Sequence, residues 1–358
     1  MLCSLKEKSD TGRGNNSRLI LKQNMENKGV SILISTYNGA LRLEKTLTAL
    51  ASLDISNIPF VEVLLIDNAS TDNTLEMAQE IWNNLGAPFS FTSLSESTPG
   101  KLYAQEKGLK HVKGEFIIIC DDDNSLFPDY LQIGYNYFQR NPKIGVLGGR
   151  GVGVSTIELP EWFEKFGYYY GCAPQAATTG NVSSVRNVVY GAGMWFRYAA
   201  YVKAKELGYQ FILLGRTGKK LTVGEDSEFC WVIIYQNYEV WYIDEMRFHH
   251  HITENRLSEK YLKELLEGMT GNGLNGQIHY RIWSGNIRHK VRFFWWKELL
   301  YTLLYIIKIP FSKQIKNKWD DFKRSKNNIA VLHYEKSNYD KKINNILEYK
   351  IKCDKIFY

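Results

Sequence analysis

Between residues 30 and 120, short apolar runs alternate with segments that place apolar residues at helical spacing, and this alternation constrains the fold most strongly. The apolar runs are expected to be strands, and they cover residues 30–36, 61–66, 89–94 and 116–120. Helices are expected between them, at residues 41–53, 74–84 and 102–111. Strands that alternate with helices predict parallel βαβ units, and therefore an α/β fold whose mostly parallel, doubly wound sheet has helices on both faces.

Three of the expected strands end in polar turns. These turns are Thr36-Tyr37-Asn38, Asp67-Asn68 and Asp121-Asp122-Asp123. Because parallel strands open at their carboxyl ends into one crevice, the three turns are expected to meet there and to bind a nucleotide. No GxGxxG follows the first strand and no GxxxxGK[ST] occurs, which argues against a dinucleotide site and against a P-loop.

The third turn places three consecutive aspartates after the fully apolar run Phe116–Cys120. Carboxylates at such short range repel one another in a partly dry site, so a positive charge is expected among them. Oxygen donors suit a hard divalent ion such as Mg²⁺ or Mn²⁺. From this stretch alone, an acidic turn or a helix cap is an equal alternative.

The pattern changes after residue 145. Small residues precede aromatic ones in YGAGMWF (190–196), which indicates either a ligand that approaches the backbone or a bulge. Glu225, Asp226 and Glu228 precede an apolar helix expected at 229–235, where acids also occur as ordinary residues of a helix start. Three histidines, 249–251, close an expected strand at 240–251, and neutral imidazole is a good metal ligand.

Taken in order, these segments resemble the family 2 glycosyltransferases, which bind nucleotide sugars on a GT-A fold. The matching segments are VSILISTYNG (30–39), LLIDNASTDNT (64–74), STPGKLYAQEKGL (97–109), IIICDDDN (117–124), GAGMWFR (191–197), GEDSEFC (224–230) and HHITENRLSEKYL (250–262). Their order and spacing carry the resemblance, which covers roughly residues 30–270.

The resemblance implies a role for each matching residue. Donor-binding residues would be Thr36, Tyr37, Asn38, Asp67, Gly100, Lys101, Asp121 and Asp122. The metal, Mn²⁺ or Mg²⁺, would be held by Asp121 and Asp123 with His250 or His251. Asp226 would be the catalytic base, and the acceptor would contact Gly191, Ala192, Trp195 and Glu225. The QxxRW motif of processive polysaccharide synthases is absent, which favours transfer of a single sugar.

The implied activity is inverting, metal-dependent transfer from a nucleotide-diphosphate sugar to a glycan or lipid-linked acceptor in bacterial surface-polysaccharide synthesis. Two alternatives are open. A non-catalytic nucleotide-sugar or glycan-binding module would need the aspartate cluster but not Asp226. A nucleotidyltransferase would carry a Gly-rich first loop with Lys or Arg, which STYNGA lacks. No RRM, KH or zinc-finger pattern occurs, so nucleic acid is not an expected partner.

The last expected helix, within residues 291–310, is very apolar. Its 17 residues from 293 to 309 would reach about 25 Å, which is short for a hydrocarbon core of about 30 Å. Trp295, Trp296, Leu299, Leu300, Leu303, Ile306 and Ile307 share one face of a helical wheel, and Lys297, Glu298 and Lys308 lie mostly on the other. A basic stretch follows, so the segment is expected to lie on an anionic membrane surface. Packing on the catalytic domain is the alternative.

These expectations divide the chain. Residues 1–28 would be a disordered arm, and residues 29–270 the catalytic domain, with a nucleotide-sugar half at 29–145 and an acceptor half at 146–270. Residues 271–358 would form a basic helical extension. Five scattered cysteines without a CxxC pair favour a reducing compartment, and no apolar stretch follows Met1. The expected location is therefore the cytoplasm, at the inner face of the plasma membrane.

Overall fold

The structure is a computed structural model that describes residues 27–213, 215, 224–271, 273–311 and 318–358. The sequence predicted an arm at residues 1–28, and its residues 1–26 lie outside the described part of the chain. Residues 27 and 28 already belong to the first strand, β1 (Asn27–Thr36).

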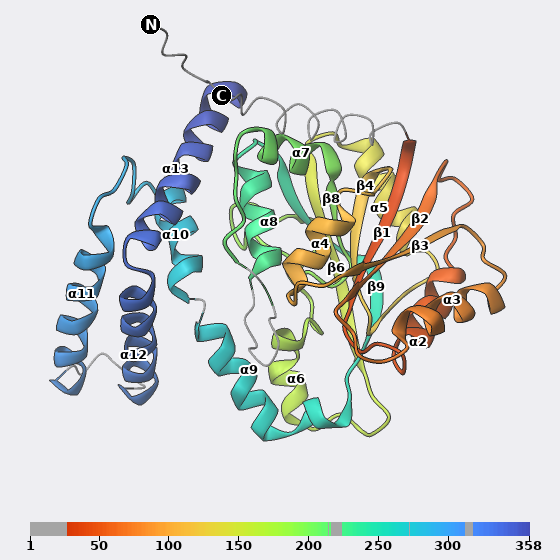
Figure 1. The fold of residues 1–358 in the computed structure, drawn as a ribbon, viewed down its shortest axis with the longest axis horizontal. Helices are drawn as coiled ribbons and strands as arrows, with labels where there is room; N and C mark the ends of the chain where they lie inside the picture. Colours follow the sequence, from red (N-terminus) through yellow and green to blue (C-terminus); the bar gives the residue numbers. More distant parts are fainter. Residues whose placement is uncertain (1–26, 214, 216–223, 272, 312–317) are drawn as a thin grey trace, which may run out of the picture.

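The described strands form one nine-stranded sheet, with β7 (Gly180–Asn181) attached to β9 and the others in the order β3-β2-β1-β4-β8-β6-β9-β5 (Figure 1). The other strands are β2 (Val61–Asn68), β3 (Ser90–Glu96), β4 (Gly114–Asp121), β5 (Asn124–Leu126), β6 (Ile144–Val154), β8 (Met194–Arg197) and β9 (Glu239–His251). The long pairings β3-β2-β1-β4 and β6-β9 are parallel, and the antiparallel pairings are short. All four strands predicted between residues 30 and 120 are present, with ends that differ by at most three residues.

Helices cover both faces of the sheet. They are α2 (Leu43–Ala51), α3 (Thr74–Asn84), α4 (Lys101–Gly108), α5 (Tyr130–Arg140), α6 (Trp162–Phe166), α7 (Tyr198–Glu206) and α8 (Glu225–Ile234), with a 3₁₀ turn at Gly167–Tyr170. Side chains along β1 alternate between the faces: Ile32 and Ile34 pack with α2, and Leu33 packs with α4. Both faces are therefore buried, as the continuous apolar runs of β1, β2 and β4 require.

One predicted helix begins earlier than expected. The sequence predicted an apolar helix from Phe229, but α8 starts at Glu225. Its first turn is acidic, and carboxylates are favourable at the positive end of the helix dipole. The start of α8 thereby brings Glu225 and Asp226 to the edge of the sheet.

The chain continues with helices beside the sheet (Figure 1). They are α9 (Glu259–Gly271), α10 (Gly273–Trp283), α11 (Phe294–Lys308), α12 (Lys318–Glu335) and α13 (Ser337–Phe357), with 3₁₀ turns at Glu254–Leu257 and Ile309–Phe311. A third apolar core joins α10 and α13 to α8, through residues such as Val232, Tyr235 and Ile346. Among the described residues, no helix combines the length and apolar character that crossing a membrane requires.

Candidate active site

The three polar turns meet where the strand order reverses, between β1 and β4. The register pairs Thr36 with Asp67 and Ser35 with Asp121, so the carboxyl ends of β2, β1 and β4 lie in one row. The sequence prediction that these turns share one crevice edge is thus met by the register. The remaining site is built around the three aspartates at the end of β4.

Asp122 is held by the first turn. The Thr36 hydroxyl donates to Asp122 Oδ2 at 2.6 Å, and the Arg42 guanidinium donates to the same oxygen at 2.6 Å. Burial and the neighbouring Asp123 nevertheless raise the pKa of Asp122 above its ordinary value. This carboxylate therefore ties the start of α2 to the end of β4 and forms part of the crevice wall.

Asp123 faces the closing segment of the domain. Its Oδ2 accepts a hydrogen bond from Arg256 at 2.8 Å and lies 3.3 Å from His250 Nε2. Burial alone would lower the pKa of His250, but the Asp123 carboxylate outweighs it and raises that pKa to about 10. The imidazole is thus a cation beside Asp123 when only protein groups are present.

Lys101 links the end of β4 to the start of α8. Its Nζ donates to Asp121 at 2.7 Å and lies 3.6 Å from Glu225 Oε1. Burial opposes the charge, yet Asp121 and Glu225 together raise the pKa of Lys101. Gly100 precedes it with a φ of 142°, a conformation that favours glycine, and its N–H donates to Asn68 Oδ1 at 2.7 Å.

Asp226 lies one residue beyond Glu225 in the first turn of α8. Its Oδ2 accepts from the Gly191 N–H at 2.9 Å, and its Oδ1 accepts from the Ser227 N–H at 2.7 Å. A Cβ at position 191 would come within 3.0–3.2 Å of the Asp226 side chain, so only glycine allows this approach without a shift. Gly191, one of the small residues predicted to allow a close approach to the backbone, therefore accommodates the Asp226 carboxylate.

Glu225 is more enclosed than Asp226. Burial, more than the repulsion of Asp226, raises the pKa of Glu225, and Lys101 opposes that rise. Gly215 covers the Glu225 carboxyl group, because a Cβ there would lie 2.7–2.9 Å from it. Of the two adjacent acids, Glu225 is buried and Asp226 is partly exposed.

Tyr37, Asn38 and Asp67, which were predicted to bind the donor, lie in the turn after β1 and at the end of β2. Tyr37 is exposed, and Asn38 has a φ of 49° and accepts from the Thr71 N–H at 2.8 Å. Asp67 is buried, and its Oδ1 accepts from the Ser70 N–H at 3.3 Å. These contacts fix the turn after β1 against the turn after β2.

Three predicted site residues do not face the crevice. Trp195 was expected to contact the acceptor, but its side chain is fully buried against α5, where its ring lies on Gly134. Ala192 is buried in the same core. His251 was paired with His250 as an alternative metal ligand, but strand alternation turns its imidazole away, and its Nε2 lies 2.8 Å from Ser125 Oγ.

Sequence reasoning missed Arg42 and Arg256. It expected positive charge among the aspartates and assigned that charge to a metal ion, whereas each carboxylate also has a cationic side chain: Lys101, Arg42 and Arg256 for Asp121, Asp122 and Asp123. Arg256 stands in the quoted segment HHITENR, six residues after His250. Arg256 could have been considered because it stands in that segment, whereas Arg42 lies 80 residues from Asp122 and gives no local signal.

The donor set at Asp123 can be tested against a divalent ion. Within the described ranges, no three His, Cys, Asp or Glu side chains are grouped so that they could hold a metal ion. Asp123 and His250 together offer one carboxylate and one imidazole at 3.3 Å. Such a pair fits Mn²⁺ or Mg²⁺ when phosphate oxygens and water complete the coordination, as is usual for Mg²⁺.

The chain resembles known proteins in sequence. Residues 31–195 match the family described as Glycosyl transferase family 2. A poly-beta-1,6-N-acetyl-D-glucosamine synthase of Staphylococcus epidermidis is 30% identical over 135 residues, which are 38% of this chain and 31% of that protein. The poly(ribitol-phosphate) beta-N-acetylglucosaminyltransferase TarS of Staphylococcus aureus is 28% identical over 134 residues, 36% of this chain and 23% of that protein. The chain thus spans about a third or less of either relative.

It also resembles a solved structure. The crystal structure of S. aureus TarS 1–349 in complex with UDP-GlcNAc matches 92% of this chain and 93% of that chain, with a TM-score of 0.52 and 16% sequence identity. This similarity confirms the predicted fold class, a GT-A sheet followed by C-terminal helices.

Proposed function

We propose, from the premise that residues 31–195 are a family 2 glycosyltransferase domain, that this chain transfers a sugar from a nucleoside-diphosphate donor to an acceptor hydroxyl in cell-envelope polysaccharide synthesis. The observation that carries the proposal is the meeting of donor-type and acceptor-type residues in one crevice. Lys101 makes that junction, because it contacts Asp121 of the donor half and Glu225 beside the proposed base.

The donor would lie across the carboxyl ends of β2, β1 and β4. The base and ribose would contact the rim formed by Thr36, Tyr37, Asn38 and Asp67, with Asp121 or Asp122 near the ribose. Lys101 and Arg256 would face the diphosphate, because they are the cations nearest the ends of the aspartate row. N-acetylglucosamine occurs in the names of both relatives, so UDP-GlcNAc is the first donor to test.

Asp226 would act as the general base. The acceptor oxygen attacks the anomeric carbon, the carboxylate takes the hydroxyl proton, and the bond to the diphosphate breaks with its electron pair on the departing oxygen. General-base catalysis of this kind contributes about 10²–10⁴-fold. A single displacement inverts the anomeric carbon. The hydrogen bonds from Gly191 and Ser227 would hold the carboxylate in place for this step.

The departing diphosphate needs charge stabilisation. We assign Asp123 and His250 as the protein ligands of a Mn²⁺ or Mg²⁺ ion, which when bound supplies Lewis-acid stabilisation worth several kcal/mol. Arg256 lies 2.8 Å from the same carboxylate and can turn to a phosphate oxygen. Its guanidinium matches phosphate geometry in a way that a lysine does not.

The absence of a QxxRW motif supports addition of a single sugar rather than processive synthesis. The acceptor would be a glycan or a lipid-linked glycan, and helix α11 supports a peripheral membrane contact at the inner face of the plasma membrane. Trp296, Leu300 and Ile307 of α11 are exposed, and a basic stretch follows the helix. In this proposal residues 29–270 form the catalytic domain and residues 271–358 the helical extension.

A donor-binding screen tests the proposal. The melting temperature of the full chain is measured with UDP, UDP-GlcNAc, UDP-glucose and GDP-mannose, each with Mn²⁺. A donor present at 100 times its Kd should stabilise the fold by about 2.7 kcal/mol. Release of the nucleoside diphosphate, UDP or GDP, from the stabilising donor then separates a transferase from a binding module, which would be stabilised without turnover. No stabilisation by any of the four would contradict the proposal.

A further inference from the structure

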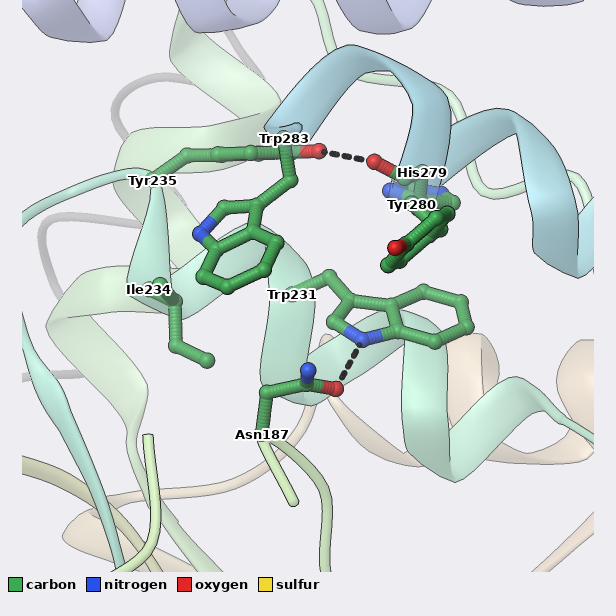
Figure 2. Close-up of a pocket in the computed structure, with 7 residues that line it drawn as sticks. All are labelled: Asn187, Trp231, Ile234, Tyr235, His279, Tyr280 and Trp283. Atoms are coloured by element: carbon green, nitrogen blue, oxygen red, sulfur yellow. Dashed lines mark hydrogen bonds between the residues drawn. The ribbon is translucent and has the colours of Figure 1, made fainter. Parts of the chain in front are cut away.

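An aromatic pocket lies away from the aspartate row, between α8, α10 and the loop that precedes β8 (Figure 2). It encloses about 70 Å³ and is lined chiefly by Asn187, Trp231, Tyr235, His279, Tyr280 and Trp283. Tyr280 is 60% exposed and Trp283 is 46% exposed, so the pocket opens at the surface between these two rings. None of these residues has a part in the donor site.

The floor of the pocket carries fixed polar groups. The Trp231 indole N–H donates to Asn187 Oδ1 at 2.8 Å, which fixes the indole and orients the Asn187 amide (Figure 2). The His279 ring stacks on Trp231 with 4.7 Å between ring centroids. Two independent contacts therefore hold the Trp231 indole plane rigidly against the pocket.

His279 leaves one polar atom unsatisfied. The side chain is 1% exposed, and its Nδ1 has no hydrogen-bond partner among the described residues, while its Nε2 lies 3.3 Å from the Tyr209 hydroxyl. A buried polar atom without a partner is costly. That atom is itself enclosed by protein, so the polar group that the pocket wall offers to a ligand is the Asn187 amide, which its bond to Trp231 orients.

The lining restricts the class of ligand. It contains no Lys, Arg, Asp or Glu, so it offers nothing to a phosphate or another charged group. An acyl chain would cover the Asn187 amide nitrogen without offering it a hydrogen bond. Aromatic walls with a few fixed polar atoms suit a neutral ligand that has both apolar faces and hydroxyl edges. Sugar rings have this character.

We propose that the pocket is a glycan-binding subsite, which takes a sugar residue of the acceptor chain remote from the hydroxyl that reacts. The inference rests on the proposed function, because it assigns the acceptor as a glycan of several residues. Two elements join the pocket to the reaction centre. Helix α8 carries Asp226 in its first turn and Trp231 five residues later, about 7.5 Å along the axis. The loop that holds Asn187 continues to Gly191, which binds Asp226.

Glycan binding to the full chain tests this subsite. The probes are the tetrasaccharides of β-1,4-linked N-acetylglucosamine, β-1,4-linked glucose and α-1,6-linked mannose, titrated with tryptophan fluorescence as the signal. At least one should bind the wild type. Trp283→Ala and Tyr280→Ala should each weaken it about tenfold or more, which corresponds to about 1.4 kcal/mol. Trp296→Ala, which removes a similarly exposed indole from α11, should leave the affinity unchanged.

The same proteins are then tested for donor stabilisation with Mn²⁺, which should be equal in all variants. Absence of binding by all three tetrasaccharides, or unchanged affinity in both pocket variants, would overturn the subsite even where the donor stabilises the protein. Failure of every donor to stabilise the wild type would instead count against the proposed function. The two failures are thus separable.

Discussion

At the scale of single residues, two adjacent carboxylates have different surroundings. Glu225 is covered by Gly215 and paired with Lys101, while Asp226 keeps partly exposed surface and two backbone hydrogen bonds. A base must reach the acceptor hydroxyl in its charged form. Burial raises the pKa of Glu225, and in the proposed mechanism the greater exposure of Asp226 favours it as the base.

Asp226→Asn removes the proton acceptor and keeps the shape. The amide oxygen can still accept from Gly191, so we expect donor binding to stay within a few-fold while kcat falls by about 10² or more. Initial rates and donor affinity of the same protein check this. Asp129→Asn, an exposed acid before α5, is the matched control and should behave as wild type. Near-normal turnover of the Asp226 variant would contradict its role as the base and would show that it is only an acidic residue in the first turn of α8.

The metal assignment separates two neighbouring histidines. Because Asp123 lies 3.3 Å from His250 Nε2 and the His251 imidazole faces Ser125, only the first histidine should bind the ion. We expect Mn²⁺ to strengthen UDP binding to the wild type, and this increment to vanish in Asp123→Asn and His250→Gln. His251→Gln should retain it. Calorimetric titration of UDP with and without Mn²⁺ measures the increment, and equal affinities for the wild type under both conditions would refute the metal proposal.

At the scale of helices and strands, the sequence predicted what depends on local pattern. The sequence predicted β1, β2 and β4 because a strand that is buried on both faces is a continuous apolar run. It also predicted the acidic turns, because polar residues follow these runs directly where the strands end. The pairing of Arg42 with Asp122, separated by 80 residues, leaves no such mark. Trp195 was misplaced for a related reason: which face of β8 is covered by α5 depends on tertiary packing.

Glu228 anchors the segment before α8. Its carboxylate is fully buried and accepts from the Tyr209 hydroxyl and from the N–H groups of Ile212 and Leu213. Glu228→Gln places an amide NH₂ against these donors, so we expect the free energy of unfolding to fall by about 1–3 kcal/mol. Urea denaturation measures it. Glu76→Gln, in the exposed first turn of α3, should change it by about 0.5 kcal/mol or less; equal effects would show that the buried carboxylate is not an anchor.

Helix α11 differs from its predicted helical wheel. Leu299 is buried and Trp295 packs on the same core, while Glu298, expected on the polar side, is buried in an ion pair with Arg281 at 2.6 Å. The helix therefore packs on α12 and α13 through one side, and the Arg281–Glu298 ion pair joins it to α10. A second apolar side, with Trp296, Leu300, Leu303, Leu304 and Ile307, is exposed. The two sequence alternatives, membrane contact and packing, concern different sides of one helix.

The exposed side can be tested without disturbing the packed one. Leu300→Glu with Leu303→Glu should abolish sedimentation with phosphatidylglycerol vesicles and leave the melting temperature unchanged, because both side chains already face solvent. Val185→Glu with Ile157→Glu adds the same charge at exposed sites elsewhere and should leave sedimentation intact. Vesicle binding absent from the wild type would contradict the membrane contact.

At the scale of the whole molecule, the helical extension shares a core with the catalytic half. The Tyr349 hydroxyl of α13 donates to the Val232 carbonyl of α8 at 3.0 Å, and Gln236 donates to Tyr349 at 2.7 Å. Ile343 and Ile346 fill the space behind α8. The proposed boundary at residue 270 is therefore not a boundary in the packing. The sequence could not show this because α8 and α13 lie about 100 residues apart.

Removal of α13 should therefore destabilise the catalytic half. A chain ending at residue 285 would expose Val232 and Tyr235, and burial of each such side chain is worth about 1.5–3 kcal/mol, so we expect aggregation or a clearly lower melting temperature.

Point variants give the same answer without truncation. Ile346→Ala, at a fully buried position of α13, should cost about 2–5 kcal/mol of unfolding free energy, whereas Ile356→Ala, on an exposed turn of the same helix, should cost far less. The decisive observation is the donor-dependent melting transition. If α13 and α8 unfold as one unit, Ile346→Ala lowers that transition as a whole; a donor-stabilised transition that keeps its wild-type midpoint would show that the catalytic half folds independently of the extension.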